Sequence, residues 1–336
     1  MRHILYFCCA LLLWQSDHAQ NTLTKKINGI SFVSNRNPVD HTNVQPLVDI
    51  NTNYAAVMPF GFIGREETSK VVYNSQRQWY GETKAGGRNY VEQLHKKGIK
   101  VMIKPHIWIR HGQYTGHLKM DNEEDWKELE TTYRNFILEY ARLAQEEKVA
   151  IFSVGVELEQ FVINRPDFWK NLIKEVKAIY KGKVTYASNW DEYSRVPFWD
   201  QLDYIGIDSY FPISEEKTPS VEQAKAGWRY WKEKLASFSK ENKKQVLFTE
   251  WGYRSMDYTG KEPWVTTRGN ANVNLEAQAN ATQAVFETFW QEDWFAGGFV
   301  WKWFIHHERS GGVQNDRFTP QNKPAQEVIK KYYGIY

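Results

Sequence analysis

Two stretches of the sequence each place a glutamate directly after a buried apolar run, and these glutamates carry the clearest chemical signal. The first stretch, 150–160, reads AIFSVGVELEQ and contains Glu157. The second, 245–254, reads QVLFTEWGYR and contains Glu250. Each apolar run has the composition of a buried strand. One such glutamate would be explained by a strand meeting solvent. Two in matching positions favour a paired-carboxylate site, because ligand sites gather at the carboxyl ends of parallel strands.

A carboxyl pair of this kind can supply a proton and a nucleophile in one reaction. The requirement is that one carboxyl is protonated while the other is ionised at the same pH. An ionised Glu250 beside Glu157 would raise the pKa of Glu157 by the like-charge effect. Glu159 competes with Glu157 for the acid role, since it lies two residues on and would share the same side of an extended strand.

Strand and helix patterns alternate along the chain that must position these residues. Besides the two glutamate stretches, strands are expected at 28–33, 54–60, 100–107, 183–188, 204–210 and 296–303. Helices are expected at 42–51, 88–97, 126–143, 168–179, 221–238, 275–290 and 324–333. Eight strands alternating with helices predict an α/β fold, a single (β/α)₈ TIM barrel.

The first twenty residues have the pattern of a secretory signal peptide. A basic residue, Arg2, precedes an apolar core, and a small residue, Ala19, stands near the end of residues 1–20. Both cysteines of the chain, Cys8 and Cys9, lie inside this core, so the mature chain would hold no disulfide. Bulky residues precede Cys8, which argues against a lipid anchor. We therefore expect a secreted or periplasmic protein whose single catalytic domain spans 21–336.

Composition restricts the class of partner. The net charge is +3, with acids and bases interspersed, so nothing indicates nucleic acid or a membrane surface as a partner. Fifteen Trp and nineteen Tyr are an unusually large number, and many fall where loops are expected. Exposed aromatic faces suit sugar rings, whose axial C–H bonds stack on them. We expect a neutral polysaccharide or oligosaccharide as the substrate, and a monomeric protein.

Four motifs carry a resemblance to a known family. They read GIKVMIKPHIWI, GVELE, TEWGY and FTPQNKPAQEVIKKYYG. Together they resemble glycoside hydrolase clan A, and are most similar to glycoside hydrolase family 113, whose members are β-1,4-mannanases. The resemblance covers nearly the whole mature chain. It implies a secreted retaining endo-glycosidase that cuts mannan or glucomannan by double displacement, with the two carboxyl groups about 5 Å apart.

The resemblance also implies roles for individual residues. Glu157 after strand four would be the acid/base, and Glu250 after strand seven the nucleophile. Tyr210 resembles the clan's tyrosine that hydrogen-bonds the nucleophile, and Trp301 matches its strand-eight tryptophan under the sugar. The clan has Asn directly before the acid/base, where it binds the sugar 2-hydroxyl, whereas this chain has Val156.

Further substrate-binding candidates lie at the ends of other expected strands. Lys104 and His106 are polar groups in an apolar run, and alternation places them on one face. Asn189, Trp190 and Asp208 follow at the ends of the next strands. The loop residues Trp79, Trp108 and Trp264 would line flanking subsites or pack the loops on the barrel.

The sequence indicates neither a cofactor nor a metal. His306 and His307 are adjacent on one loop, and such a pair alone rarely forms a ligand set. Two alternatives to the mannanase stay open at this stage. One is another clan A enzyme: a cellulase, a xylanase or an exo-mannosidase. The other is a catalytically impaired barrel that binds glycan through its aromatic residues, which Val156 makes conceivable.

Overall fold

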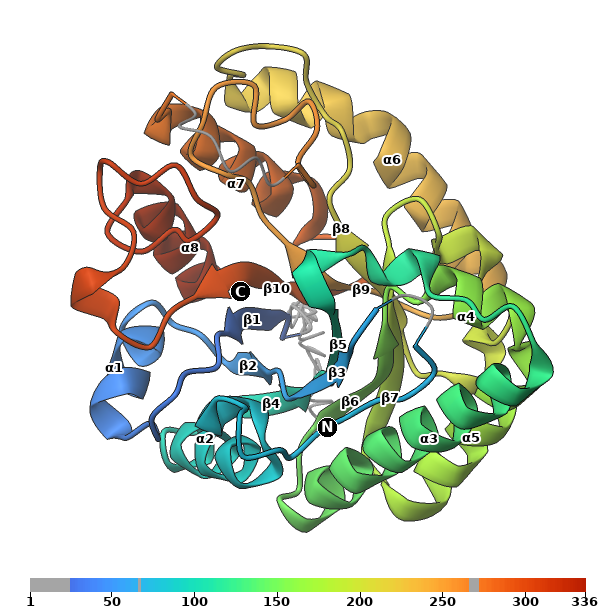
Figure 1. The fold of residues 1–336 in the computed structure, drawn as a ribbon. Coiled ribbons are helices and arrows are strands. Elements are labelled where there is room, and N and C mark those ends of the chain that lie inside the picture. The colour runs from blue at the N-terminus through green and yellow to red at the C-terminus, as the bar shows by residue number, and fades with distance from the viewer. Residues whose placement is uncertain (1–24, 66–67, 266–271) are drawn as a thin grey trace, which may run out of the picture.

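The computed structural model describes residues 25–65, 68–265 and 272–336. The expected signal peptide and both cysteines lie outside the described residues. Eight parallel strands in the described part form a closed barrel in the order β1-β10-β9-β8-β7-β6-β4-β2 (Figure 1). Their bounds are β1 (Ile27–Phe32), β2 (Tyr54–Val57), β4 (Lys100–Ile103), β6 (Ile151–Val156), β7 (Lys183–Asn189), β8 (Ile205–Ser209), β9 (Val246–Trp251) and β10 (Phe295–Trp303). The predicted (β/α)₈ barrel is confirmed.

Helices surround this barrel (Figure 1). They are α1 (His41–Asp49), α2 (Lys84–Lys96), α3 (Glu123–Glu146), α4 (Glu159–Asn164), α5 (Pro166–Ile179), α6 (Val221–Asn242), α7 (Leu275–Phe289) and α8 (Pro324–Ile335). Their starts follow from the sequence: Ser220 and Gln223 form a capping box at α6, and Pro residues open α5 and α8. No helix among the described residues is long and apolar enough to cross a membrane.

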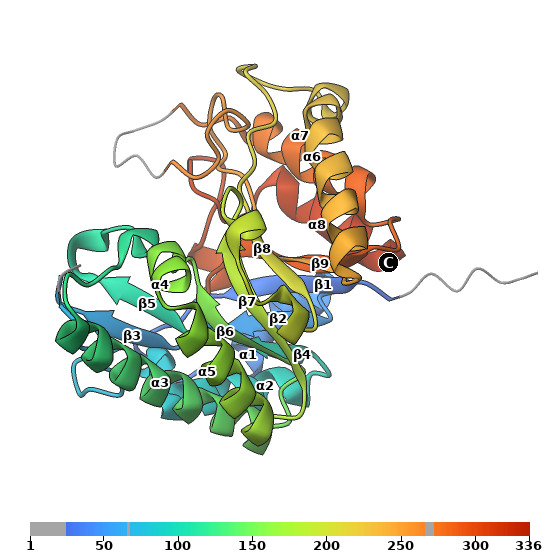
Figure 2. The ribbon, with the colours of Figure 1, turned by 90° about the vertical axis from the view of Figure 1, so that its right-hand side faces the viewer.

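Two of the expected strands are shorter than predicted. The runs 54–60 and 100–107 both break at a proline, Pro59 and Pro105, and resume as β3 (Phe60–Ile63) and β5 (His106–Ile109). These two segments pair with each other in parallel and form a separate two-stranded sheet. Figure 2 shows this pair at one end of the barrel. Proline lacks the N–H that a ladder requires, so each barrel strand ends there and the chain turns outward.

The core has two layers that fix where polar groups can sit. A large apolar cluster lies between strands and helices, and a second, smaller one fills the barrel interior, since its members come from six of the barrel strands. The interior cluster comprises Ile27, Ala56, Met102, Ile151, Leu247, Ala296 and Phe299. Lys104 lies two residues beyond Met102 and Thr249 two beyond Leu247, so alternation places both above this apolar plug.

Candidate active site

A cleft of about 1000 Å³ opens at the carboxyl ends of the strands and contains both glutamates. The β3–β5 sheet forms one wall, and the end of β10 contributes Trp301 and Lys302. Among the residues that line it are Phe60, Trp79, His106, Trp108, Tyr114, Glu157, Glu250, Trp301 and Lys302. The proline breaks in the second and third expected strands therefore build one side of the site.

A register irregularity in the sheet turns Glu250 inward. Strict alternation from Leu247 would bring Thr249 to the interior and send Glu250 outward. The β8–β9 ladder shifts between Ile207 and Asp208, so that Asp208 pairs with Glu250. Trp251 then packs outward against α7, on Phe286. Such irregularities re-aim side chains next to active sites.

Both oxygens of the Glu250 carboxylate are bound. The residue is 5% exposed. Tyr210 donates its hydroxyl to Oε2 at 2.8 Å, and Lys104 Nζ donates to Oε1 at 2.6 Å. His106 Nε2 lies 3.8 Å from the same Oε1. The carboxylate is thus held in one orientation at the edge of the cleft, as a nucleophile requires.

Lys104 links this glutamate to a second buried acid. It is fully buried and donates to both oxygens of Asp208, at 2.9 and 3.1 Å, while Thr249 donates to Oδ1 of Asp208 at 2.7 Å. Burial acts to lower the pKa of Lys104, but the charges of Asp208 and Glu250 outweigh it and raise that pKa. Burial, followed by the charge of Glu250, raises the pKa of Asp208 to about 7. Lys104 is therefore the cation that allows two acids to share this interior.

Glu157 occupies a constrained position at the end of β6. Its φ is +47°, a left-handed conformation that costs a non-glycine residue about 1 kcal/mol or more. The conformation is held from both sides: its N–H donates to the carbonyl of Ala187 at 2.8 Å, and the N–H of Leu158 donates to the Tyr186 hydroxyl at 2.7 Å. The side chain is half-buried and lines the cleft.

The electrostatic environment of Glu157 differs from that of Glu250. Burial, then the charges of Asp208 and Glu250, raises the pKa of Glu157 well above its usual range, although Lys104 opposes this. Glu157 accordingly keeps its proton at a pH where an ordinary glutamate has lost it. One cleft thus holds a carboxyl able to donate a proton and a second carboxylate bound by a cation and a tyrosine.

The competing Glu159 points elsewhere. It is the first residue of α4, and Arg195 Nε donates to its Oε1 at 2.6 Å. It is not among the residues that line the cleft. The strand ends at Val156, so the extended alternation that would have put Glu157 and Glu159 on one side does not continue.

His106 and Trp301 lie together in the cleft. Their rings are nearly parallel, 16° apart, with centroids separated by 6.2 Å. Burial, followed by the charges of Lys104 and Lys302, lowers the pKa of His106 well below its usual value, so the imidazole is neutral. Its Nε2 is buried and makes no hydrogen bond to the described residues. A buried polar atom without a partner beside an open cleft is suited to a ligand hydroxyl.

Of the other residues predicted from the sequence, Trp79 and Trp108 line the cleft, whereas Asn189 and Trp190 are not among its lining residues. Asn189 donates its amide to the Tyr114 hydroxyl at 3.0 Å. Trp190 packs in an aromatic cluster and stacks on Trp264, with centroids 5.1 Å apart. Trp79 and Trp108 line the cleft and are 43% and 50% exposed.

Three residues at or beside the site were not predicted from the sequence: Tyr114, Glu192 and Lys302. Tyr114 lines the cleft and donates its hydroxyl to Glu192 at 2.6 Å. Lys302 also lines the cleft, with its ammonium 5.1 Å from the centre of the Trp301 ring. Tyr114 and Glu192 stand on loops, where no periodicity exists to reveal them. Lys302, however, directly follows the predicted Trp301.

No group of three or more histidines, cysteines, aspartates or glutamates that could hold a metal ion occurs in the parts of the chain described above. The ring of His307, one of the two histidines considered from the sequence, stacks on Trp303 at 5.3 Å. Its Nδ1 lies 3.3 Å from the amide of Gln321. His307 therefore contributes to packing of the loop after β10.

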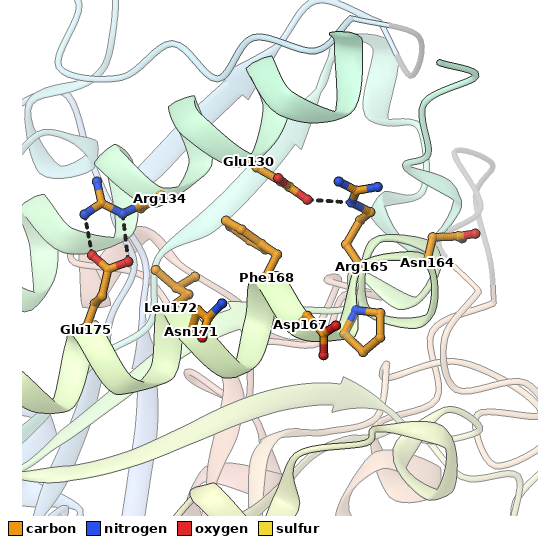
Figure 3. A pocket seen from close by; sticks show the side chains of 10 residues that line it. Glu130, Arg134, Asn164, Arg165, Asp167, Phe168, Asn171, Leu172 and Glu175 are labelled. Atoms are coloured by element: carbon orange, nitrogen blue, oxygen red, sulfur yellow. Dashed lines mark hydrogen bonds and ion pairs between the residues drawn. The ribbon is translucent and has the colours of Figure 1, made fainter. Parts of the chain in front are cut away.

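A second hollow, of about 450 Å³, lies on the outside of the barrel between α3 and α5. Four of its five charged groups form two ion pairs, Arg134 with Glu175 and Arg165 with Glu130 (Figure 3), and the fifth, Asp167, is exposed. The hollow contains neither Glu157 nor Glu250. The cleft at the barrel mouth therefore remains the candidate active site.

Comparisons with known proteins identify the family of the chain. The family model of Glycoside Hydrolase Family 113 matches residues 34–323. A GH113 β-1,4-mannanase structure is similar at a TM-score of 0.79 and 24% identity, over 93% of this chain and 100% of that one. The GH113 β-mannanase AaManA from Alicyclobacillus acidocaldarius, in complex with ManMIm, gives 0.81 and 23%, over 93% and 98%.

A β-glucuronidase from Faecalibacterium prausnitzii is more distant. It has a TM-score of 0.61 and 16% identity, and the match covers 92% of this chain and 49% of that one. Likenesses at such identities concern the fold alone. No curated protein sequence matches the chain. The family model spans most of the sequence, and the chain therefore belongs to glycoside hydrolase family 113.

Proposed function

We propose that the protein is a secreted, retaining endo-β-1,4-mannanase. The observation that carries the proposal is the pair of unlike carboxyl groups in one cleft. The pKa of Glu157 is raised by burial and by Asp208 and Glu250, whereas Glu250 is held by Lys104 and Tyr210. Retaining glycosidases require this division between a protonated acid and an ionised nucleophile.

The reaction proceeds in two displacements. Glu250 attacks the anomeric carbon, while Glu157 gives its proton to the leaving glycosidic oxygen, and a glycosyl ester forms on Glu250. Glu157, now ionised, takes a proton from water, and the resulting hydroxide equivalent attacks the same carbon and releases Glu250. Tyr210 and Lys104 position Glu250 throughout, and Lys104 stabilises the carboxylate as it leaves.

The choice of mannan rests on the family and on the cleft walls. The similar structures are named as β-mannanases. Trp301 provides a ring face at the end of β10, and Trp79 and Trp108 offer further aromatic surface along an open cleft. Val156 replaces the asparagine that binds the sugar 2-hydroxyl elsewhere in the clan. In mannose this 2-hydroxyl is axial. The unpartnered Nε2 of His106 is our candidate to form a hydrogen bond with it instead.

Export is part of the proposal and rests on residues 1–20. Their basic start, apolar core and small residue near the end are the features of a signal peptide. Expression of the full chain followed by N-terminal sequencing of the exported protein tests this. A mature N-terminus close to Asn21 is expected, and retention of Met1 on a cytoplasmic product would contradict it.

The catalytic roles are tested by variants with and without azide. Glu250→Ala should lose turnover, and azide should restore part of it with inverted configuration, because azide occupies the place of the missing nucleophile. Glu157→Ala should keep activity on aryl glycosides with good leaving groups, and azide should give the product of retained configuration. Glu159→Ala, two residues away and paired with Arg195, is the matched control. Wild-type behaviour of Glu157→Ala would refute the assignment.

Substrate choice is tested by comparing mannohexaose, cellohexaose and xylohexaose. Each good hydrogen bond to the axial hydroxyl should contribute on the order of 1 kcal/mol, or about fivefold in kcat/KM. Cleavage at internal bonds of mannohexaose, faster than for the other two, is expected. Faster cleavage of cellohexaose or xylohexaose would identify another β-glycanase, and release of mannose from one end alone would identify an exo enzyme.

A further inference from the structure

A third acid, Glu192, lies close to the cleft, although the two-carboxylate reaction does not require it. It follows β7 and is 3% exposed. Its Oε1 accepts a hydrogen bond from the Tyr114 hydroxyl at 2.6 Å. Its Oε2 is buried and has no hydrogen-bond partner among the described residues. A buried carboxyl that is only half satisfied is costly, which indicates a role beyond packing.

Tyr114 connects this acid to the cleft. It precedes the short helix η3 (Thr115–His117), lines the cleft, and is 36% exposed. Its hydroxyl donates to Glu192 and accepts from the Asn189 amide at 3.0 Å, so both of its hydrogen-bonding directions are occupied. The tyrosine is thus fixed in the wall that also holds Glu157.

We propose that Glu192 is a positioning residue that, with Tyr114, keeps the acid Glu157 protonated at neutral pH and above. The proposal rests on the proposed role of Glu157. Tyr114, whose hydroxyl accepts from the Asn189 amide, anchors the buried carboxylate of Glu192. The negative charge of this carboxylate disfavours a second negative charge in the same wall. Negative charges on two sides would then keep Glu157 protonated: those of Glu250 and Asp208 in the barrel interior, and that of Glu192 on the loop after β7.

The titration of Glu192 itself fits this role. Burial raises its pKa to about 7, although the hydrogen bond from Tyr114 opposes the increase. Glu192 is therefore a carboxylate above about neutral pH, where Glu157 most needs help to retain its proton. Glu192 is one of the charges that raise the pKa of Glu157, and Glu157 in turn raises the pKa of Tyr114. The backbone brings Glu157 and Glu192 to the same strand end: the N–H of Glu157 donates to the carbonyl of Ala187 in β7, and the N–H of Glu192 donates to the carbonyl of Asn189, the last residue of β7.

The other charged groups around the pair are already accounted for. Those that act on Glu157 or Glu192 are Lys104, Glu159, Asp191, Asp208 and Glu250. Lys104 is bound to Asp208 and Glu250. Arg195 is the cation on the short helix that follows Glu192, and its guanidinium binds Glu159 and the carbonyl of Asp191. The charge of Glu192 is therefore not neutralised by an ion pair with a described residue.

Removing the negative charge of Glu192 should shift the pH profile of the enzyme in one direction. Glu192→Gln removes the negative charge and retains an oxygen that can accept from Tyr114. Ionisation of Glu157 becomes easier, so the basic limb of the kcat/KM profile should move to lower pH by roughly 0.5–1 unit. The acidic limb should stay in place. Tyr114→Phe removes the donor that favours ionised Glu192, so it should move the basic limb in the same direction.

The experiment measures kcat/KM against pH on mannohexaose for the wild type, Glu192→Gln, Tyr114→Phe and the double variant. Asp200→Asn, an exposed acid on the short helix η5 (Trp199–Gln201), is the matched control and should leave both limbs unchanged. The double variant should show little more shift than Glu192→Gln. An unchanged basic limb in folded Glu192→Gln, or an equal shift in Asp200→Asn, would overturn the inference.

The acid role of Glu157 and the positioning role of Glu192 can be tested separately. Azide rescue of Glu157→Ala, run alongside, reports on the acid assignment alone. If that rescue gives the retained product and the basic limb of Glu192→Gln is still unmoved, only the role of Glu192 is wrong. If the rescue fails, the assignment of Glu157 is wrong whatever the profile of Glu192→Gln shows.

Discussion

Replacing Lys104 by methionine removes a cation that two buried acids, Asp208 and Glu250, share. The side chain is fully buried and makes its three hydrogen bonds to Asp208, at 2.9 and 3.1 Å, and to Glu250, at 2.6 Å. Methionine has a similar length and no charge, so Lys104→Met retains most of the packing. It leaves two carboxyl groups in a buried site without compensation.

The expected loss of stability is large. Removing one partner of a buried ion pair costs about 3–5 kcal/mol, since the other charge stays buried and unpaired. The entropy of unfolding is about 2.1 cal/mol/K per residue, or about 0.6 kcal/mol/K for roughly 300 residues. Lys104→Met should therefore lower the Tm by about 5–8 °C. Its activity should fall too, with the acidic limb moved to higher pH, because ionisation of the buried acids becomes harder.

Thermal unfolding followed by circular dichroism at neutral pH measures this effect. Lys100→Met is the matched control: Lys100 opens β4, which ends directly before Lys104, but it is exposed, and the change should cost less than about 0.5 kcal/mol. Adding Asp208→Asn to Lys104→Met should recover part of the Tm, because it removes one uncompensated acid, while activity stays low. A Tm within about 1 °C of the wild type, together with an unmoved acidic limb, would refute the reasoning. About 1 °C is roughly the scatter between melts and is well under the expected shift.

Further predictions concern the neighbours of Glu250 and the requirement for metal. Tyr210→Phe removes the 2.8 Å hydrogen bond to Glu250 Oε2 and should lower kcat about 100-fold, with a smaller change in KM; equal kcat would show that the bond is not used. Trp301→Ala should lower kcat/KM on mannohexaose roughly fivefold or more, mainly through KM, whereas an unchanged KM would argue against a sugar on this ring. Treatment with EDTA should leave activity unchanged, and a loss that a divalent ion restores would contradict the metal-free mechanism.

Alternating apolar and amphipathic patterns were enough to predict the barrel, but not the ends of two strands. The runs 54–60 and 100–107 are largely apolar, so the pattern alone extends each of them as a single strand. Pro59 and Pro105 were the available signal, because a proline in a central strand argues against that strand. What the prolines could not reveal is that the two outer segments pair with each other, since that contact depends on the closed barrel beneath them.

The candidate site was likewise only partly predictable from the sequence. Glu157 and Glu250 were predicted from the apolar runs that precede them, and Tyr210 was predicted from the resemblance to the clan. The inward turn of Glu250 depends on a register shift against β8, which no pattern within one strand records. Lys104 could be placed inside the barrel by alternation, but its contact with Asp208 joins residues 104 positions apart. Loop residues such as Tyr114 have no periodicity at all.

The configuration of the first product tests the central claim most directly. Mannohexaose is hydrolysed by the wild type inside the NMR spectrometer, and the anomeric signals are followed before mutarotation equilibrates them. If Glu250 forms a glycosyl ester and Glu157 activates the water, the β-anomer of the shorter oligosaccharide should appear first and the α-anomer only later. First appearance of the α-anomer would mean a single displacement, and would contradict the assignment of Glu250 as the nucleophile.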